Sequence, residues 1–300
     1  MSGIREQIPL ASYTWWKIGG LADHMVEPKS VADLAEAMRV ALQSSWPLTV
    51  LGGGSNILVS DRGIEGLTIL LRSLNAIESV REVDGRLEII AQAGANKAEL
   101  TKIFLQNKLA PALFLCGLPG EVGGGVVMNA GVGEMITPRE FVEITDWIEV
   151  LKPTEGGKVE KRTYSGRELT WTYRHCAGWQ PGVISRVAVS WPLDPKPDLM
   201  DLVRQANKNR LARQPLEWPS CGSVFRNPPG GKSGALIEQS GLKGFQIGAA
   251  QVSEKHANFI INRGGATAAD VRKLIEHVQS TVKAKHGFDL EPEVRFIGRW

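Results

Sequence analysis

The sequence has few cysteines and no long apolar run. Its three cysteines, Cys116, Cys176 and Cys221, are widely separated and odd in number, a pattern that argues against a disulfide framework and favours a reducing compartment. No CxxC pair occurs, so neither structural zinc nor any other metal is expected. No run of eighteen apolar residues occurs, and the opening MSGIREQIPLASYTWW lacks the apolar centre of a signal peptide. These absences predict a cytoplasmic protein that does not insert into membranes.

A block of basic residues is also missing. No run of five or more Lys and Arg occurs and the formal net charge is only +3, so nucleic acid is not expected as a partner. Hydrophobic residues make up 43% of the chain and charged residues 22%, the balance of an ordinary globular protein. At 300 residues the chain reaches the upper limit of a single core, which predicts more than one domain.

Hydrophobic periodicity predicts a mixture of helices and strands after an irregular start. Ser30 precedes a helical pattern over 31–43, and Thr267 with Asp270 opens another over 268–286. Asp84-Gly85 lies between two alternating stretches and predicts a hairpin. Further strands are expected at 48–51, 57–60, 67–71, 141–151, 158–164, 183–191 and 256–262.

Prolines mark the predicted domain boundary. Pro192, Pro195 and Pro197 in WPLDPKPD favour an extended linker, and a helical pattern follows them. We therefore predict a first domain with two subdomains and a second, smaller domain: 1–195 (about 1–75 and 76–195) and 196–300.

Two glycine-rich segments are candidates for ligand binding. In LGGGSN, residues 51–56, three glycines let backbone N–H groups turn toward an anion such as a diphosphate, although a simple tight turn is the commoner explanation. Ile57 stands where GxGxxG would need its third glycine, so a Rossmann site for NAD is not expected. The segment CGLPGEVGGGVVMNAGVG, residues 116–133, permits close approach to a planar ligand, with a tightly packed strand pair as the alternative.

Three further residues suit a reduction that ends in a proton transfer. They are Arg174 in TYRHC, Ser223 in PSCGSVFRNP and Glu293 in LEPEVRFIG. A guanidinium is a permanent cation, a serine hydroxyl can donate a proton, and a carboxylate can hold either partner in place. Such a set could protonate a carbanion next to a carboxylate. Taken singly, each residue would be read as an ordinary ion-pairing, strand or surface residue.

These strings together resemble the UDP-N-acetylenolpyruvoylglucosamine reductases. The matching strings run along nearly the whole chain: TWWKIGG, LGGGSNILVSD, GLPGEVGGGVVMNAG, YRHC for the family's YRxS, CGSVFRNP for GSxFKNP, and LEPEVRFIG. The resemblance implies an α+β fold, with a two-part FAD-binding domain of the vanillyl-alcohol oxidase or PCMH type followed by a smaller α+β substrate-binding domain. No room remains for a substrate-covering insertion, so the shorter, type II form is expected.

The resemblance also assigns roles to particular residues. It makes Arg174, Ser223 and Glu293 catalytic, with Ser223 as the proton donor, and it makes Tyr173, Arg213 and Asn227 substrate-binding. Cys176 stands where the family usually has serine, and Arg213 and Arg226 stand where it usually has lysine. The implied FAD-binding residues are Gly52, Gly53, Gly54, Ser55, Asn56, Gly117, Gly120, Gly124 and Ala130. LGGGSN contains neither His nor Cys for a covalent link, so non-covalent FAD is expected.

The implied reaction is a step of peptidoglycan precursor synthesis, and so of cell wall biogenesis, cell shape and cell division. NADPH reduces FAD, hydride passes to C3 of UDP-N-acetylglucosamine enolpyruvate, Arg174 and Glu293 stabilise the enolate, and Ser223 protonates C2 to give UDP-N-acetylmuramate.

Two other classes of protein remain open at this point. An FAD-dependent oxidase of the wider flavoprotein group would pass electrons to oxygen and form peroxide. A non-catalytic binder of nucleotide-sugars would need no proton donor. The sequence makes no prediction of oligomeric state.

Overall fold

The computed structural model describes residues 3–133 and 136–300, and it divides into two compact units. Unit 1 is formed by 1–5, 25–53 and 66–209, and unit 2 is formed by 6–24, 54–65 and 210–300. Each unit has its own cluster of buried hydrophobic residues. The predicted domains are continuous in sequence, whereas each of these units is assembled from three stretches of chain.

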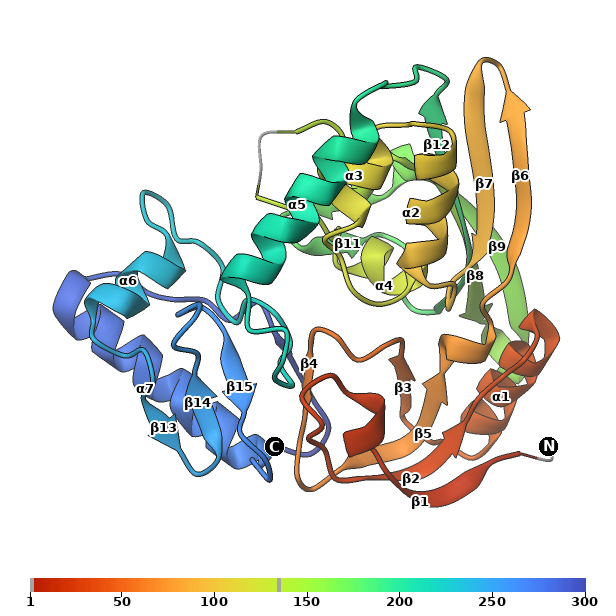
Figure 1. Cartoon of the computed structure of the whole chain (residues 1–300). Helices are drawn as coiled ribbons and strands as arrows, with labels where there is room; N and C mark the ends of the chain where they lie inside the picture. The colour runs from red at the N-terminus through yellow and green to blue at the C-terminus, as the bar shows by residue number, and fades with distance from the viewer. Residues whose placement is uncertain (1–2, 134–135) are drawn as a thin grey trace. The chain divides into compact units, whose positions relative to one another are not determined.

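A five-stranded antiparallel sheet is the centre of unit 1 (Figure 1). Adjacent strands exchange hydrogen bonds along its whole width. Asp84 and Gly85 have φ values of 49° and 73°, which confirms the predicted hairpin turn. In order across the sheet, the strands are β6 (Ile77–Val83), β7 (Arg86–Gln92), β12 (Val183–Pro192), β8 (Thr145–Pro153) and β9 (Val159–Ser165).

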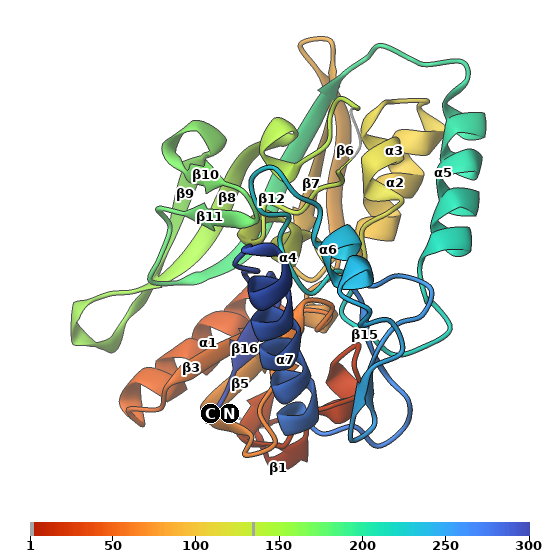
Figure 2. The same cartoon turned by 90° about the vertical axis from the view of Figure 1, so that its left-hand side faces the viewer.

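Short helices pack against this sheet. Helices α2 (Lys97–Gln106) and α3 (Pro111–Leu115) lie together beside it (Figure 2). Helix α4 (Val122–Val127) contacts β7 and β12 and lies within the second glycine segment. The hairpin of β10 (Thr170–Thr172) and β11 (His175–Ala177) carries Arg174 in its turn.

The predicted helix over 31–43 is confirmed. It is α1 (Val31–Gln43), and the side chain of Ser30 accepts a hydrogen bond from the Asp33 N–H at its start. Strand β3 (Leu48–Leu51) pairs in parallel with β5 (Ile64–Leu70) from Leu48 opposite Leu67 to Leu51 opposite Leu70.

The prediction of an irregular start is wrong. Residues 5–26 contain strands β1 (Arg5–Pro9) and β2 (Leu21–Val26). The four residues Arg5, Glu6, Gln7 and Pro9 of β1 are exposed, and Gln7 has a φ of 52°. This strand therefore shows no clear alternation of buried and exposed positions that a sequence pattern would reveal.

Unit 2 is built around the long helix α7 (Ala268–His286). The helix packs against β13 (Gln246–Ile247), β14 (Ala250–Val252) and α6 (Ser233–Gln239), and β15 (Ile260–Asn262) completes a three-stranded antiparallel sheet. The predicted start and end of α7 are confirmed by a Thr267–Asp270 capping box and a left-handed Gly287 with a φ of 77°.

Segments from the first quarter of the chain complete unit 2. Strand β4 (Ile57–Val59) pairs in parallel with β16 (Arg295–Ile297). Trp16 is fully buried, and its indole N–H donates to the Ile260 carbonyl at 2.7 Å. The remaining helix, α5 (Leu199–Arg213), has residues in both units. No helix within the described ranges is long and apolar enough to span a membrane.

Candidate active site

Ser223 and Glu293 lie on neighbouring extended segments of unit 2. The Glu293 N–H donates to the Val224 carbonyl at 2.7 Å, and Phe225 forms a β-bridge with Pro292. On the other side, Ser223 forms a β-bridge with Phe259. Two residues that are 70 positions apart in sequence are thus held side by side by backbone hydrogen bonds.

The Glu293 carboxylate adds negative charge to this part of unit 2. Burial raises the pKa of the Cys221 thiol, and the nearby Glu293 carboxylate raises it further. The charge of Glu293 therefore acts on Cys221, two residues before Ser223. The neighbouring Glu291 carboxylate is engaged elsewhere, since it forms an ion pair of 3.1 Å with Arg226.

Asn56, a predicted FAD-binding residue, is tied to the same segment. Its side-chain amide donates to the Glu293 carbonyl at 3.1 Å, and its own carbonyl accepts from the Arg295 N–H at 3.0 Å. This links the end of LGGGSN to the backbone of Glu293 within unit 2.

Arg174 lies in unit 1, at the turn between β10 and β11, with a φ of 54°. Its guanidinium donates to the carbonyl of Gly131 at 2.8 Å and to that of Asn129 at 3.4 Å, and it pairs with Glu140 at 3.2 Å. It also lies 4.6 Å from the centre of the Tyr173 ring. The predicted catalytic cation is therefore held on the second glycine segment, next to the exposed ring of a predicted substrate ligand.

The first glycine segment already accepts an anion. The N–H of Gly53 donates to the Glu121 carboxylate, and a Cβ on Gly52 would lie 3.0 Å from an oxygen of the same group. Gly54 has a φ of 67° and no room for a side chain, because a Cβ there would clash with the Tyr13 carbonyl. Backbone of this kind fits a diphosphate, which carries the same type of oxygen acceptors.

Burial perturbs the charged groups beside this loop. It raises the pKa of Glu121, against the opposing effect of the Gly53 N–H and of Lys97. Lys97 is almost completely buried, and burial lowers its pKa to about 8. The backbone N–H of Lys97 donates to the Gly120 carbonyl at 3.1 Å, so both side chains belong to one corner of unit 1.

The second glycine segment forms a helix rather than the tightly packed strand pair considered as its alternative. Gly123 and Gly125 are buried in α4, and a Cβ on either would clash with Ala93 or with the Phe141 ring. Gly124 is exposed, and a Cβ there would meet nothing within 4 Å among the described residues. Packing thus explains two of these glycines and leaves Gly124 available to border a ligand.

The other predicted FAD-binding residues border the same elements. Gly120 has a φ of 86° in the turn before α4, and a Cβ on Gly117 would make only an ordinary contact with Val132. Ala130 and Ser55 are both half-buried.

The other residues to which the family resemblance draws attention lie on separate elements. Arg213 is exposed at the end of α5, and Asn227 is exposed before α6, where its side-chain carbonyl accepts from the Ser233 N–H at 3.0 Å. The amide of Asn227 also carries two N–H donors suited to an anionic ligand.

Cys176 is fully buried, and burial raises the pKa of its thiol to about 11. The thiol therefore stays neutral at physiological pH.

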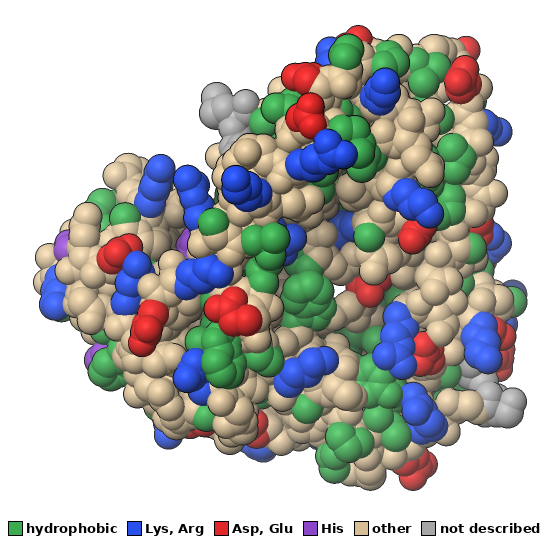
Figure 3. All heavy atoms as spheres, viewed as in Figure 1, with side chains coloured by type: hydrophobic (Ala, Val, Ile, Leu, Met, Phe, Trp, Pro, Cys, Tyr) green, Lys and Arg blue, Asp and Glu red, His purple; other side chains and the backbone are tan. Residues whose placement is uncertain are grey.

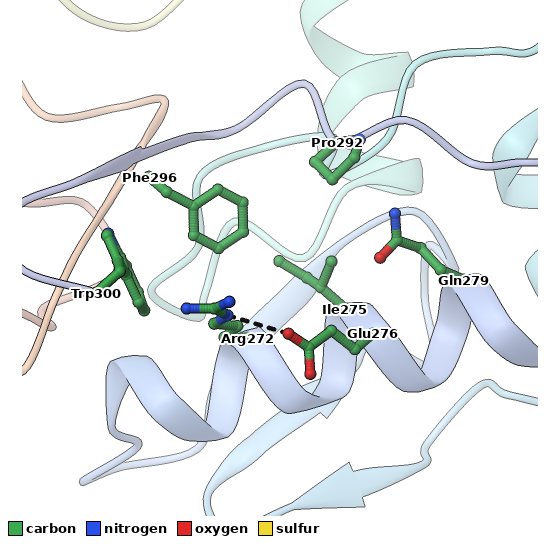
Figure 4. A pocket seen from close by; sticks show the side chains of 7 residues that line it. All are labelled: Arg272, Ile275, Glu276, Gln279, Pro292, Phe296 and Trp300. Atoms are coloured by element: carbon green, nitrogen blue, oxygen red, sulfur yellow. Dashed lines mark hydrogen bonds and ion pairs between the residues drawn. The ribbon is translucent and has the colours of Figure 1, made fainter.

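A surface pocket of about 330 Å³ lies elsewhere in unit 2 (Figure 4). It is lined by α7 and by Pro292, Phe296 and Trp300, with an Arg272–Glu276 ion pair along one side. Pro292 and Phe296 line this pocket, and Glu293 is not among its lining residues. On the face drawn in Figure 3, basic and acidic side chains are interspersed among the described residues.

Three charged residues near the predicted site were not identified from the sequence: Lys97, Glu121 and Glu140. Each lies in a stretch where a charged residue is normally solvated, and each becomes notable only through a partner distant in sequence. Glu121 lies inside the second glycine-rich string, so an acid within a segment expected to border a planar ligand was the one available signal.

Comparisons with known proteins agree along the whole chain. Residues 214–297 match the family model described as UDP-N-acetylenolpyruvoylglucosamine reductase, C-terminal domain, and residues 22–160 match the model of an FAD binding domain. A curated UDP-N-acetylenolpyruvoylglucosamine reductase of Lactobacillus acidophilus is 41% identical over 99% of this chain and 95% of its own length. One of Streptococcus pneumoniae is 42% identical over 98% and 94%.

A solved structure gives the same result. The UDP-N-acetylenolpyruvylglucosamine reductase (MurB) of Thermus caldophilus superposes with a TM-score of 0.78 and 30% identity, over 98% of this chain and 99% of that one. This match and the mixed helix and strand content confirm the predicted α+β fold. Identity of this extent over nearly the full length of both proteins means that the chain belongs to the UDP-N-acetylenolpyruvoylglucosamine reductase family.

Proposed function

We propose that Arg174, Ser223 and Glu293 carry out the reaction of this family in this chain. The chain is an FAD-containing oxidoreductase that reduces UDP-N-acetylglucosamine enolpyruvate to UDP-N-acetylmuramate in peptidoglycan precursor synthesis, with NADPH as reductant. The observation that carries this conclusion is the near full-length identity to curated reductases, joined to an FAD binding domain model over residues 22–160. We place the reaction in the cytoplasm.

The residues of the two glycine segments fit non-covalent FAD. The Gly53 N–H already holds a carboxylate, and the lack of side chains at Gly52 and Gly53 leaves the backbone accessible to a diphosphate. Gly54, Ser55 and Asn56 continue this cradle, while Gly117, Gly120, Gly124 and Ala130 would border the flavin. When bound, FAD supplies hydride transfer from NADPH to the substrate.

After hydride transfer, the side chains must stabilise the negative charge on the substrate and protonate C2. Addition of hydride to C3 of the enolpyruvyl group places negative charge on C2 and on the adjacent carboxylate. The permanent charge of Arg174 stabilises that charge, since it requires no proton transfer of its own. Ser223 donates its hydroxyl proton to C2, and Glu293 orients the groups around the developing enolate.

Substrate contacts are assigned on the same basis. Tyr173, Arg213 and Asn227 would bind the nucleotide-sugar, the latter two through donors suited to its anionic groups. We assign FAD binding to 1–195, which also contributes Tyr173 to the substrate, and substrate binding to 196–300, in the shorter, type II form of the family.

The test separates the two halves of the reaction. Under anaerobic conditions, NADPH should bleach the flavin absorbance, and UDP-N-acetylglucosamine enolpyruvate should then restore it. Ser223→Ala should slow restoration by about 100-fold or more, the usual effect of losing a proton donor, and should leave bleaching almost unchanged.

Two outcomes would contradict this assignment. Reoxidation of the wild-type flavin by oxygen with peroxide formation, and not by the enolpyruvyl substrate, would indicate an oxidase. Tight nucleotide-sugar binding without turnover in both wild type and Ser223→Ala would indicate a non-catalytic binder.

A further inference from the structure

Glu140 holds two partners in unit 1 at once. One carboxylate oxygen, Oε1, pairs with the Arg174 guanidinium at 3.2 Å, and the other, Oε2, accepts from the Asn129 side-chain amide at 3.1 Å. The side chains of Arg174 and Glu140 are only 11% and 21% exposed. Because both are largely removed from water, their charge-assisted hydrogen bond is less screened than a surface ion pair would be.

The backbone around Glu140 is itself fixed. Glu140 begins a short 3-10 helix, where it forms a capping box with Glu143. It also forms a β-bridge with Gly131, and the next residue, Phe141, is completely buried. The carboxylate therefore extends from an anchored position rather than from a flexible loop.

Asn129 contacts both Glu140 and Arg174. Its side-chain carbonyl accepts from the Val142 N–H at 3.0 Å, while its amide donates to Glu140 and its backbone carbonyl accepts from Arg174. Arg174 thus contacts two backbone carbonyls of the second glycine segment, those of Asn129 and Gly131, and the carboxylate of Glu140, seven positions beyond its end.

We propose that Glu140 is a positioning residue for Arg174. It supplies the negative charge that fixes the guanidinium beside Asn129 and Gly131, so that the cation is in one place when charge develops on the substrate. A neutral acceptor in place of Glu140 would hold the guanidinium less firmly, because neutral acceptors bind it more weakly than a carboxylate does. This inference rests on the catalytic role of Arg174 given under the proposed function.

The experiment compares Glu140→Gln with Glu143→Gln in the FAD-loaded protein. Both residues belong to the same capping box, but the Glu143 carboxylate accepts from the backbone N–H groups of Arg139 and Glu140, whereas the Glu140 carboxylate pairs with Arg174. Glu140→Gln should slow reoxidation of the reduced flavin by the enolpyruvyl substrate by about 10–100-fold, the usual effect of misplacing a catalytic group. Flavin bleaching by NADPH and FAD affinity should stay within about twofold of wild type, because neither uses Arg174 as proposed. Glu143→Gln should leave both half-reactions near wild type.

A double variant tests whether Glu140 acts through Arg174. If it does, Glu140→Gln combined with Arg174→Ala should be no slower than Arg174→Ala alone. Should Glu140→Gln fail to fold, Glu140→Asp provides the same test, since its shorter carboxylate cannot keep both partners, and the same half-reaction should slow.

The possible failures are distinguishable. If Arg174→Ala leaves reoxidation unchanged, the catalytic role of Arg174 is wrong. If Arg174→Ala slows reoxidation while Glu140→Gln does not, or if the two effects multiply in the double variant, the inference about Glu140 is overturned and the proposed function stands.

Discussion

At the scale of single residues, Glu121 places an acid on the loop that we propose to hold the FAD diphosphate. Its carboxylate takes the Gly53 N–H, and burial raises its pKa. Two cations act on it. Lys97 is buried with a pKa lowered to about 8, and Arg72 is paired with Glu27. Arg72 keeps its charge at all relevant pH values, and it lowers the pKa of Glu27, which stays ionised. Of the described charged residues that act on Glu121, Lys97 is therefore the one that titrates, together with Glu121 itself.

This environment predicts that FAD binds more tightly as pH falls. A raised pKa means that Glu121 takes up a proton at higher pH than an exposed glutamate, and the neutral form no longer repels a diphosphate. Lys97 gains its charge as pH falls through about 8. Both changes favour an anion, so the dissociation constant should fall by about tenfold between pH 8.5 and pH 5, the effect of one unit of coupled pKa shift. Flavin fluorescence during titration of apoprotein with FAD measures it.

Glu121→Gln is the matched variant for this prediction. It keeps the size of the side chain but is neutral at every pH, so it should bind FAD more tightly than wild type at pH 8 and show a flatter pH profile. A wild-type dissociation constant that stays the same across the range would rule out competition between Glu121 and the cofactor.

At the scale of elements, local signals predicted some structures well. Ser30 caps the start of α1, and Thr267 with Asp270 caps the start of α7. Asp84-Gly85 forms the turn of the β6–β7 hairpin with positive φ values. Such signals lie within a few positions of each other, so a sequence reveals them.

Helix α4 could not be predicted in this way. Three of its six residues, in VGGGVV, are glycine, which disfavours a helix by about 1 kcal/mol per residue relative to alanine. Tertiary packing compensates, since Gly123 fits against Ala93 and Gly125 against the Phe141 ring. The candidate site shows the same limit. Family strings predict Arg174, Ser223 and Glu293 as site residues, whereas the proposed role of Glu140 depends on a contact with a residue 34 positions away.

Two neighbouring glycines of α4 should respond oppositely to alanine. Gly125→Ala places a Cβ against the buried Phe141 ring and should lower the unfolding free energy of the apoprotein by about 1–3 kcal/mol. Gly124→Ala adds a methyl at an exposed position with space around it among the described residues, and should raise the unfolding free energy by about 0.5–1 kcal/mol. Urea unfolding of both apoproteins measures the two effects.

The same pair separates packing from ligand contact. If the flavin borders Gly124, as proposed, then Gly124→Ala should weaken FAD binding even though it stabilises the apoprotein. Unchanged FAD affinity in this variant would place the flavin away from Gly124, and equal stability changes in the two variants would contradict the packing explanation.

At the scale of the whole molecule, unit 2 depends on residues from the first quarter of the chain. Trp16 is one of its core residues, and the Asn262 side chain donates to the Trp16 carbonyl at 2.9 Å. Asp61 accepts from the N–H groups of Ala268 and Ala269 at the beginning of α7. Strand β4 supplies the parallel partner of β16. Residues 6–24 and 54–65 therefore supply unit 2 with part of its core, a cap for α7 and the strand β4. Without them, unit 2 would be incomplete.

This dependence predicts that residues 196–300 do not fold alone. The proline-rich boundary predicted near residue 195 suggests a separable domain, but a fragment that starts there has no Trp16, no Asp61 and no β4. Loss of a large buried aromatic alone costs about 3–5 kcal/mol, a large part of the 5–15 kcal/mol that stabilises a typical domain. The isolated fragment should show little near-ultraviolet circular dichroism and no cooperative urea transition.

Cleavage of the folded chain provides the control. A protease site placed between Pro192 and Pro197 breaks the same peptide link but leaves 6–24 and 54–65 in the mixture. Since unit 2 is assembled from both pieces, the cleaved protein should keep its near-ultraviolet signal, and Trp16→Ala should weaken that association. Cooperative unfolding of the 196–300 fragment by itself would show that the C-terminal core is sufficient and that the early segments are accessory. Because unit 2 includes residues 6–24 and 54–65, we expect these early segments to be required for the folding of the unit that contains Ser223 and Glu293.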